Sequence, residues 1–214
     1  MIPLEQTVRE AGTAGDPHWA AYLAGRLERP AEGSLEHLFY PAHPRGRGIC
    51  RLDPAEGRFL HDRVRALAKP DVLEIGRFTG GSTLLLAQAV RPFGSVVSLD
   101  LDPRCDAVLG ATLERWGWKD SVALVVGDSR RRELPGMRFN VLFIDGDHSY
   151  EGVRADFEHW AAQLDVGGHV FFHDDADRPG ICGVWRFCRE LEGRPGWRLI
   201  ARELSVSLYQ KEAP

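Results

Sequence analysis

Residues 71–82 read DVLEIGRFTGGS. The first five residues form a short, largely apolar run that favours a buried β-strand, and Gly76 ends it. Glycines allow the chain to turn sharply, and the apolar segment from Ser82 to Val90 predicts a helix directly after that turn. The stretch is therefore expected to fold as strand, tight turn and helix, the first half of a β-α-β unit.

The same alternation continues on both sides of this stretch. A preceding helix is predicted to begin at Pro54, with Asp53 as its N-cap, and to end at Pro70. Further strands are predicted at 95–99, 122–126, 141–144 and 170–172, with a terminal strand pair at 197–200 and 206–209; further helices are predicted near 104–116, over Val153, Phe157, Trp160 and Leu164, and near 183–191. This order predicts a Rossmann-like α/β fold: a seven-stranded, mostly parallel sheet with helices on both faces and a C-terminal antiparallel pair.

The N-terminal residues differ in character from the rest of the chain. Residues 1–52 are rich in Pro, Gly and Ala, with two helix-like stretches at Leu4–Ala11 and His18–Leu27 and a stretch at 30–48 that has the composition of a loop. We expect residues 1–52 to form a helical and loop extension, either a tail or a lid, and residues 53–214 to form the main domain.

Composition excludes several classes of protein. With 214 residues, 43% hydrophobic and 27% charged, the chain is typical of a soluble globular domain and unlike collagen or a disordered segment. The net charge of −4 disfavours a nucleic-acid binder held by phosphate contacts. No apolar run approaches the ~18 residues of a membrane span, and no secretory signal is recognised, so we expect a cytoplasmic protein without a membrane partner. The four cysteines form no C-x-x-C pair. The sequence does not decide between a monomer and a homo-oligomer.

Acidic residues lie at or beside the carboxyl ends of the predicted strands. They are Glu74, Asp100, Asp128, Asp145, Asp174 and Asp175. Ligands of parallel α/β sheets bind at this edge. Asp100 is placed to accept hydrogen bonds from a ribose diol, or to cap a helix, although Asp102 before Pro103 is the better N-cap. Carboxylates gathered within a few ångströms would repel each other, which a hard cation such as Mg²⁺ relieves; turn formation and helix capping are the alternative.

The glycine loop gives the first resemblance to a known family. Its pattern, E-x-G-x-x-x-G-G, departs from the dinucleotide pattern G-x-G-x-x-G and resembles motif I of the class I S-adenosylmethionine (SAM)-dependent methyltransferases. A tight strand–helix turn without a ligand is the alternative. The resemblance implies SAM contacts at Glu74, Gly76, Phe78, Gly80, Ser82, Asp100, Asp128, Ser129 and Asp145, with Asp100 at the ribose and Asp128 and Ser129 at the adenine.

A second stretch narrows the resemblance. The segment IDGDHSYEGVRADFEHWAAQLDVGGHVFFHDD, residues 144–175, is similar to metal-dependent O-methyltransferases of the catechol and caffeoyl-CoA type. It is closer still to the macrocin and mycinamicin branch that modifies antibiotic sugars, and to cephalosporin-pathway relatives. This resemblance implies that Asp145, Asp174 and Asp175 bind Mg²⁺.

His148 occupies the place of the general base in that resemblance. The catechol-type enzymes have a lysine there, and the antibiotic-sugar branch has a histidine. A histidine with an ordinary pKa near 6.5 would accept a proton from a hydroxyl at neutral pH. The alternative for His148 is a turn residue at the start of the following helix.

These observations predict a SAM- and Mg²⁺-dependent O-methyltransferase acting on a hydroxyl of a small molecule, such as a sugar, polyketide or phenol in natural-product synthesis. Three rivals stay open: a non-catalytic SAM-binding regulator or scaffold, an NAD-binding oxidoreductase, and a cephalosporin-type reaction other than simple hydroxyl methylation. The retained acids and His148 disfavour the first, and the glycine spacing disfavours the second.

Overall fold

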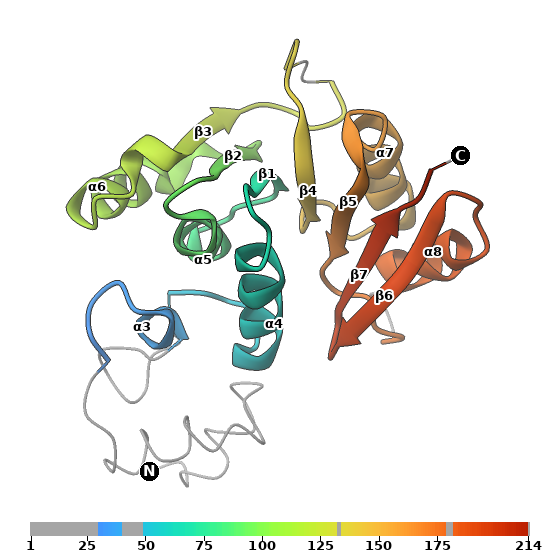
Figure 1. Cartoon of the computed structure of the whole chain (residues 1–214), viewed down its shortest axis with the longest axis horizontal. Helices are drawn as coiled ribbons and strands as arrows, with labels where there is room; N and C mark the ends of the chain where they lie inside the picture. Colours follow the sequence, from blue (N-terminus) through green and yellow to red (C-terminus); the bar gives the residue numbers. More distant parts are fainter. Residues whose placement is uncertain (1–29, 40–48, 132–133, 179–181, 214) are drawn as a thin grey trace, which may run out of the picture.

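A computed structural model describes residues 30–39, 49–131, 134–178 and 182–213. Its centre is a seven-stranded sheet in the order β3-β2-β1-β4-β5-β7-β6 (Figure 1). The strands are β1 (Asp71–Ile75), β2 (Ser95–Asp100), β3 (Val122–Val126), β4 (Phe139–Ile144), β5 (Leu164–Phe172), β6 (Trp197–Glu203) and β7 (Val206–Lys211). The first five strands are parallel, and β7 runs antiparallel to both β5 and β6. The predicted fold class is confirmed.

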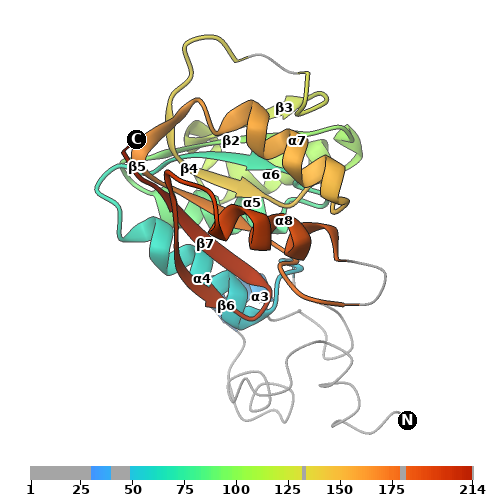
Figure 2. The same cartoon turned by 90° about the vertical axis from the view of Figure 1, so that its right-hand side faces the viewer.

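Helices cover both faces of the sheet (Figure 2). They are α3 (Leu35–Phe39), α4 (Pro54–Arg65), α5 (Gly81–Val90), α6 (Asp106–Arg115), α7 (Tyr150–Trp160) and α8 (Gly183–Glu192). Side chains of α3, α4, α5 and α6 form one apolar core against the sheet, whereas those of α7 and α8 form the second core on the opposite face. Strands β1 and β4 are buried on both faces, which explains why they read as continuous apolar runs.

The start of α4 follows the sequence prediction closely. Asp53 accepts the Ala55 N–H at 2.9 Å, and the Glu56 side chain accepts the Asp53 N–H at 3.0 Å, which together form a capping box. Asp102 likewise caps the short 3₁₀ turn Pro103–Cys105, as expected. The α4 helix ends at Arg65, one turn before Pro70.

Two local predictions are wrong. The 30–48 stretch was expected to be a loop, but Leu35–Phe39 forms the short helix α3, because Leu38 and Phe39 are buried against the core. Leu164 was expected on the helix after Tyr150, but it begins β5 and its apolar side chain enters the same core from the strand. The predicted helices Leu4–Ala11 and His18–Leu27 lie outside the described residues.

The topology fixes where a ligand would bind. From β1 the sheet continues through β2 and β3 on one side and through β4 and β5 on the other. The strand order therefore reverses between β1 and β4, and crevices of α/β sheets form at the carboxyl ends of the strands at such a point. Within the described part of the chain, none of the helices is long and apolar enough to cross a membrane.

Candidate active site

The turn between β1 and α5 is shaped by two glycines. Gly76 and Gly80 have left-handed φ values of 85° and 89°. A Cβ on Gly76 would lie 2.2 Å from the carbonyl oxygen of Asp145, and a Cβ on Gly80 would lie 2.6 Å from the Leu109 side chain. Both positions therefore require glycine for conformation and for space. The turn brings the ends of β1 and β4 into direct backbone contact.

Asp100 and Arg77 hold this turn in place. One carboxylate oxygen of Asp100 accepts the N–H groups of Arg77 and Phe78 at 2.8 and 2.9 Å, and the other accepts the Asp102 N–H at 2.8 Å. The buried Arg77 guanidinium forms a two-pronged ion pair with Asp106 at 2.6 and 2.7 Å. A carboxylate has about four acceptor positions, so Asp100 keeps room for about one further donor, less than a bidentate ribose contact needs.

Glu74 lies beneath the turn and lines neither of the cavities described below. It is fully buried, and one of its oxygens accepts the hydroxyls of Thr83 and Ser98, both at 2.5 Å. Burial raises the pKa of Glu74 to about 7, although nearby hydroxyls lower it in part. The structure therefore gives this predicted cofactor residue the position of a brace between β1, β2 and α5.

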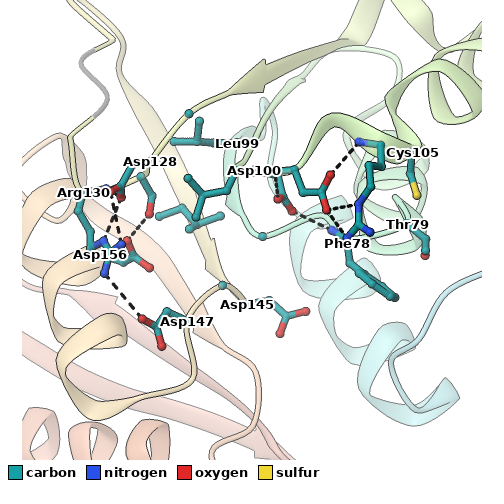
Figure 3. Close-up of a pocket in the computed structure, with 18 residues that line it drawn as sticks. Phe78, Thr79, Leu99, Asp100, Cys105, Asp128, Arg130, Asp145, Asp147 and Asp156 are labelled. Carbon is teal, nitrogen blue, oxygen red and sulfur yellow. Dashed lines mark hydrogen bonds and ion pairs between the residues drawn. The ribbon is translucent and has the colours of Figure 1, made fainter.

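A cavity of about 660 Å³ lies along the strand ends. In Figure 3, Phe78, Asp100 and Cys105 lie at one end of it, Asp128, Arg130, Asp147 and Asp156 lie at the other, and Asp145 lies between them. Its lining contains six carboxylates and two guanidinium groups: Asp100, Asp102, Asp128, Asp145, Asp147 and Asp156, with Arg104 and Arg130. The cavity is therefore strongly acidic.

The far end of this cavity is built around Asp156. Ser129 donates its hydroxyl to Asp156 at 2.5 Å, and the Trp160 ring N–H donates to the Ser129 carbonyl at 3.0 Å. Asp156 is 1% exposed, and burial raises its pKa. Asp128 instead pairs with Arg130 at 2.9 Å, which lowers the pKa of Asp128. Both predicted adenine residues, Asp128 and Ser129, line the cavity.

A second cavity, of about 330 Å³, adjoins the first. The two share the wall residues Gly76, Phe78, Thr79, Asp145 and Gly146. The second cavity adds Ser82 from α5, Arg51 and Leu52 from the segment before α4, and the side chains of His148 and His173. Because Phe78 lines both cavities, it lies where they meet. Its φ is 47°, and 68% of its surface is exposed.

His148 lies between two carboxylates. Its Nε2 is 3.2 Å from Asp145 Oδ1, and its Nδ1 is 3.0 Å from Asp174 Oδ2. The same Asp145 oxygen is 2.9 Å from His173 Nδ1, and His173 Nε2 is 3.5 Å from the buried Glu56. Asp145, His148 and Asp174 are thus brought together as predicted, with His173 and Glu56 extending the row.

This arrangement makes His148 a stronger base than the sequence suggested. Hydrogen bonds to Asp145 and Asp174 raise the pKa of His148 to about 10. Burial alone would lower the pKa of His173, but hydrogen bonds to Asp145 and Glu56 outweigh burial and raise it to about 10. The expectation that His148 titrates near neutrality is therefore wrong, because two carboxylates stabilise its protonated form.

Asp175 lies apart from this group. Its side chain is fully buried and contacts Arg189 Nη2 at 3.1 Å and Arg202 Nε at 2.9 Å, from α8 and β6. Asp174 has a left-handed φ of 61°, so the chain turns sharply after β5 and the two neighbouring carboxylates point to different partners. Among the described residues, no group of three or more candidate ligands is arranged to hold a metal ion.

Two site residues were missed by the sequence reasoning. Glu56 was not singled out, because nothing local in the sequence reports that its side chain also reaches Ser205 and His173. Asp156 carried a readable signal: it lies at helical spacing between Val153 and Trp160, which makes it an acid on the buried face of α7.

The chain resembles known proteins in sequence and in fold. A family model described as a methyltransferase domain matches residues 73–174. A catechol O-methyltransferase from Mycobacterium tuberculosis is 35% identical over 127 residues, which cover 58% of this chain and 56% of that protein. A catechol O-methyltransferase from Niastella koreensis is 26% identical over 63% of this chain and 62% of its own length. The matches therefore span a little over half of these relatives.

Solved structures share the fold over most of the chain. The O-methyltransferase TomG from Streptomyces achromogenes, involved in tomaymycin synthesis and solved with SAM, superposes with a TM-score of 0.69 at 21% identity. The likeness covers 90% of this chain and 95% of TomG. Residues 73–174 therefore match the methyltransferase domain model, and the chain is similar in sequence to catechol O-methyltransferases and shares the fold of an O-methyltransferase solved with SAM.

Proposed function

We propose that this chain transfers the methyl group of SAM to a hydroxyl group of a small molecule. One observation carries the proposal: an acidic cavity suited to SAM shares a wall at Asp145 with a second cavity, and His148 lines that second cavity. The arrangement offers one chamber for the methyl donor and one for the acceptor, with a base beside their junction.

The charge of the first cavity favours SAM over NAD. SAM carries a positive sulfonium, whereas NAD carries two anionic phosphates. Six carboxylates and two guanidinium groups line the cavity, so a cationic ligand is attracted and a pyrophosphate is repelled. The acidic lining and the glycine turn therefore both favour SAM over NAD as the ligand of this cavity.

Several residues would hold the cofactor. Ser129, supported by Asp156, and Asp128 would contact the adenine, and the remaining acceptor position of Asp100 would take one ribose hydroxyl. The turn at Gly76 would let the methionine part pass close to the backbone. Gly80 and Glu74 would act through the shape of the turn, and Ser82 lies on the side of the second cavity.

His148 would remove the acceptor proton. The hydroxyl oxygen gives its proton to a ring nitrogen of His148 and attacks the methyl carbon, while the methyl–sulfur bond breaks and leaves its electron pair on sulfur. The products are the methyl ether and S-adenosylhomocysteine (SAH). Both ring nitrogens face carboxylates, so one of these contacts must open, and the ring must first lose the proton that the raised pKa retains.

A magnesium site made from the three expected ligands does not fit this arrangement. Asp145 and Asp174 offer the oxygen ligands that Mg²⁺ prefers, but Asp175 is occupied by two arginines. Its carboxylate would have to leave both guanidinium groups to reach Asp145. Magnesium dependence therefore stays a prediction from the sequence, and no step above uses a metal.

A phenol is the acceptor class best supported among the sugars, polyketides and phenols that the sequence leaves open. The curated relatives at 35% and 26% identity are named for catechol. A role in natural-product synthesis is supported by the resemblance to antibiotic-modifying enzymes and by the fold shared with TomG.

Thermal denaturation with SAH and with NAD tests the proposal, followed by mass spectrometry of catechol incubated with SAM and the protein. SAH at about 100 times its Kd should add roughly 2.7 kcal/mol of stability, a rise in Tm of about 5–10 °C for a domain of this size. A rise with NAD and none with SAH would overturn the proposal. Binding of SAH without methylation of any acceptor would favour the regulatory rival.

A further inference from the structure

The two cavities differ in charge. The first is lined by six carboxylates, whereas the second has a single carboxylate, Asp145, and two arginines, Arg51 and Arg77. Arg77 is fully committed: its guanidinium binds Asp106 and donates to the carbonyls of Ser98 and Val125 at 3.0 and 2.9 Å. The Arg51 guanidinium, by contrast, has no hydrogen bond or ion pair to any residue in the described ranges.

The backbone around Arg51 is fixed. Cys50 and Leu52 on either side are buried, at 4% and 6% exposure, and the Cys50 N–H donates to the Leu38 carbonyl at 2.8 Å. Asp53, directly after, caps α4. Arg51 itself is exposed between these two buried neighbours, so its side chain lies on the open side of the segment. A Cβ on Gly81 would lie 2.5 Å from Cys50 Cα, so this segment packs directly on the start of α5.

Arg51 thus presents a cation without a partner among the described residues, at the wall of the cavity that contains His148. A neutral acceptor would give the Arg51 guanidinium no anionic partner in the cavity. A carboxylate matches the planar guanidinium fork and can accept two parallel hydrogen bonds from it. Pairing would also fix the orientation of the acceptor relative to the shared wall at Phe78 and Asp145.

We propose that Arg51 binds a carboxylate carried by the methyl acceptor, so that the protein acts on hydroxylated carboxylic acids in preference to neutral hydroxyl compounds. This inference rests on the proposed methyltransferase function and names its substrate class. The α-carboxylate of SAM offers the same chemistry from a second source. The experiment must therefore separate the acceptor from the cofactor.

The test compares the wild type with Arg51→Ala, Arg51→Lys and the control Arg65→Ala, an exposed arginine of α4 that lines neither cavity. Calorimetry measures the affinities for SAH and for 5′-methylthioadenosine, which lacks the amino-acid part. It then measures binding of 3,4-dihydroxybenzoate and of its uncharged methyl ester to each protein saturated with SAH.

The wild type should bind the acid roughly two- to fivefold more tightly than the ester, a difference typical of one exposed charge pair. Arg51→Ala should weaken the acid alone and abolish the preference, Arg51→Lys should retain part of it, and Arg65→Ala should match the wild type. The affinity for SAH should be unchanged in all four proteins.

Three results would overturn the inference. A wild type that binds the acid no more tightly than the ester, or binds neither, removes the need for an anionic acceptor. A loss of SAH affinity in Arg51→Ala, with 5′-methylthioadenosine unaffected, assigns Arg51 to the cofactor carboxylate. Equal weakening of acid and ester indicates a packing role. Failure of the wild type to bind SAH is a different result, because it rejects the proposed function itself.

Discussion

Gly76 and Asp145 meet backbone to backbone: a Cβ on Gly76 would lie 2.2 Å from the carbonyl oxygen of Asp145. The contact joins the ends of β1 and β4, where the strand order reverses, and both residues line both cavities. A single close approach therefore sets the positions of the glycine turn and of the carboxylate beside His148.

Replacing Gly76 by Ala should damage the fold and the site together. The left-handed φ of 85° strains any other residue by about 1–3 kcal/mol, and the clash with Asp145 adds a cost of about the same size. Chemical denaturation should show a loss of roughly 3 kcal/mol, with SAH affinity reduced. Gly136→Ala is the matched control, because Gly136 has a φ of 75° but nothing within 4 Å of its Cβ position. An equal loss in both variants would contradict the steric argument.

The raised pKa of His148 predicts an alkaline rate profile. With a pKa of about 10, the ring is protonated at neutral pH, so the basic form and kcat/KM should rise with pH up to about 10. His148→Ala should lower kcat about 10²–10⁴-fold and remove that rise. The pH dependence of methylation checks both. A profile unchanged in His148→Ala would remove His148 from the role of base.

Asp174 is expected to influence the pH dependence of kcat/KM through its contact with His148. Because its hydrogen bond to His148 helps to raise the pKa of the imidazole, Asp174→Asn should shift the ascending limb of kcat/KM towards neutral pH. The rate rises with pH, but the stability that the raised His148 pKa provides falls with pH. This stabilisation is complete below the unfolded pKa near 6.5 and decreases as pH rises towards 10. Asp174→Asn should therefore lose stability mainly at neutral and acid pH. A rate profile that stays at the wild-type position would show that Asp174 does not control His148.

The sequence was sufficient for the fold because the decisive signals are local. Short apolar runs located all or part of each strand, and the Asp53–Pro54 pair located the start of α4. Leu164 was misassigned because helical spacing from Trp160 continues for one more turn in the sequence, whereas tertiary packing begins β5 there.

The site was only partly predictable, because its chemistry depends on residues far apart in the chain. Topology places the ends of β1, β2, β3 and β4 together, which is why Asp100, Asp128 and Asp145 line one cavity as expected. The pKa of His148 depends on Asp174 across 26 positions of the chain, and the partners of Asp175 follow from the turn at Asp174. The directions in which the Asp174 and Asp175 side chains point cannot be read from composition or spacing.

Asp175 is expected to stabilise the fold. Removing its charge leaves Arg189 and Arg202 with Glu192 as their remaining shared acidic partner. Because both guanidinium groups are partly exposed, Asp175→Asn should cost roughly 1–3 kcal/mol in the free energy of unfolding. Asp177→Asn, at an exposed position nearby, should change it by less than about 0.5 kcal/mol. Equal stability of Asp175→Asn and wild type, with a magnesium response seen in the wild type alone, would instead support the metal role predicted from sequence.

Asp156 offers a prediction that separates charge from hydrogen bonding. Burial raises the pKa of this carboxyl, so its ionised form is disfavoured in the fold, and the stability that its neutral form provides is lost as pH rises through the folded pKa. Asp156→Asn is neutral at every pH and can still accept the Ser129 hydroxyl; relative to the wild type it should gain stability between about pH 4 and pH 7 and retain SAH binding. Asp156→Ala removes the acceptor as well and should weaken SAH about tenfold, a typical loss of roughly 1–2 kcal/mol for an unpaired buried hydroxyl. Urea midpoints at both pH values, with SAH titrations, measure these differences. Equal SAH affinity in Asp156→Ala and wild type would show that Ser129 needs no support from α7 to bind the adenine.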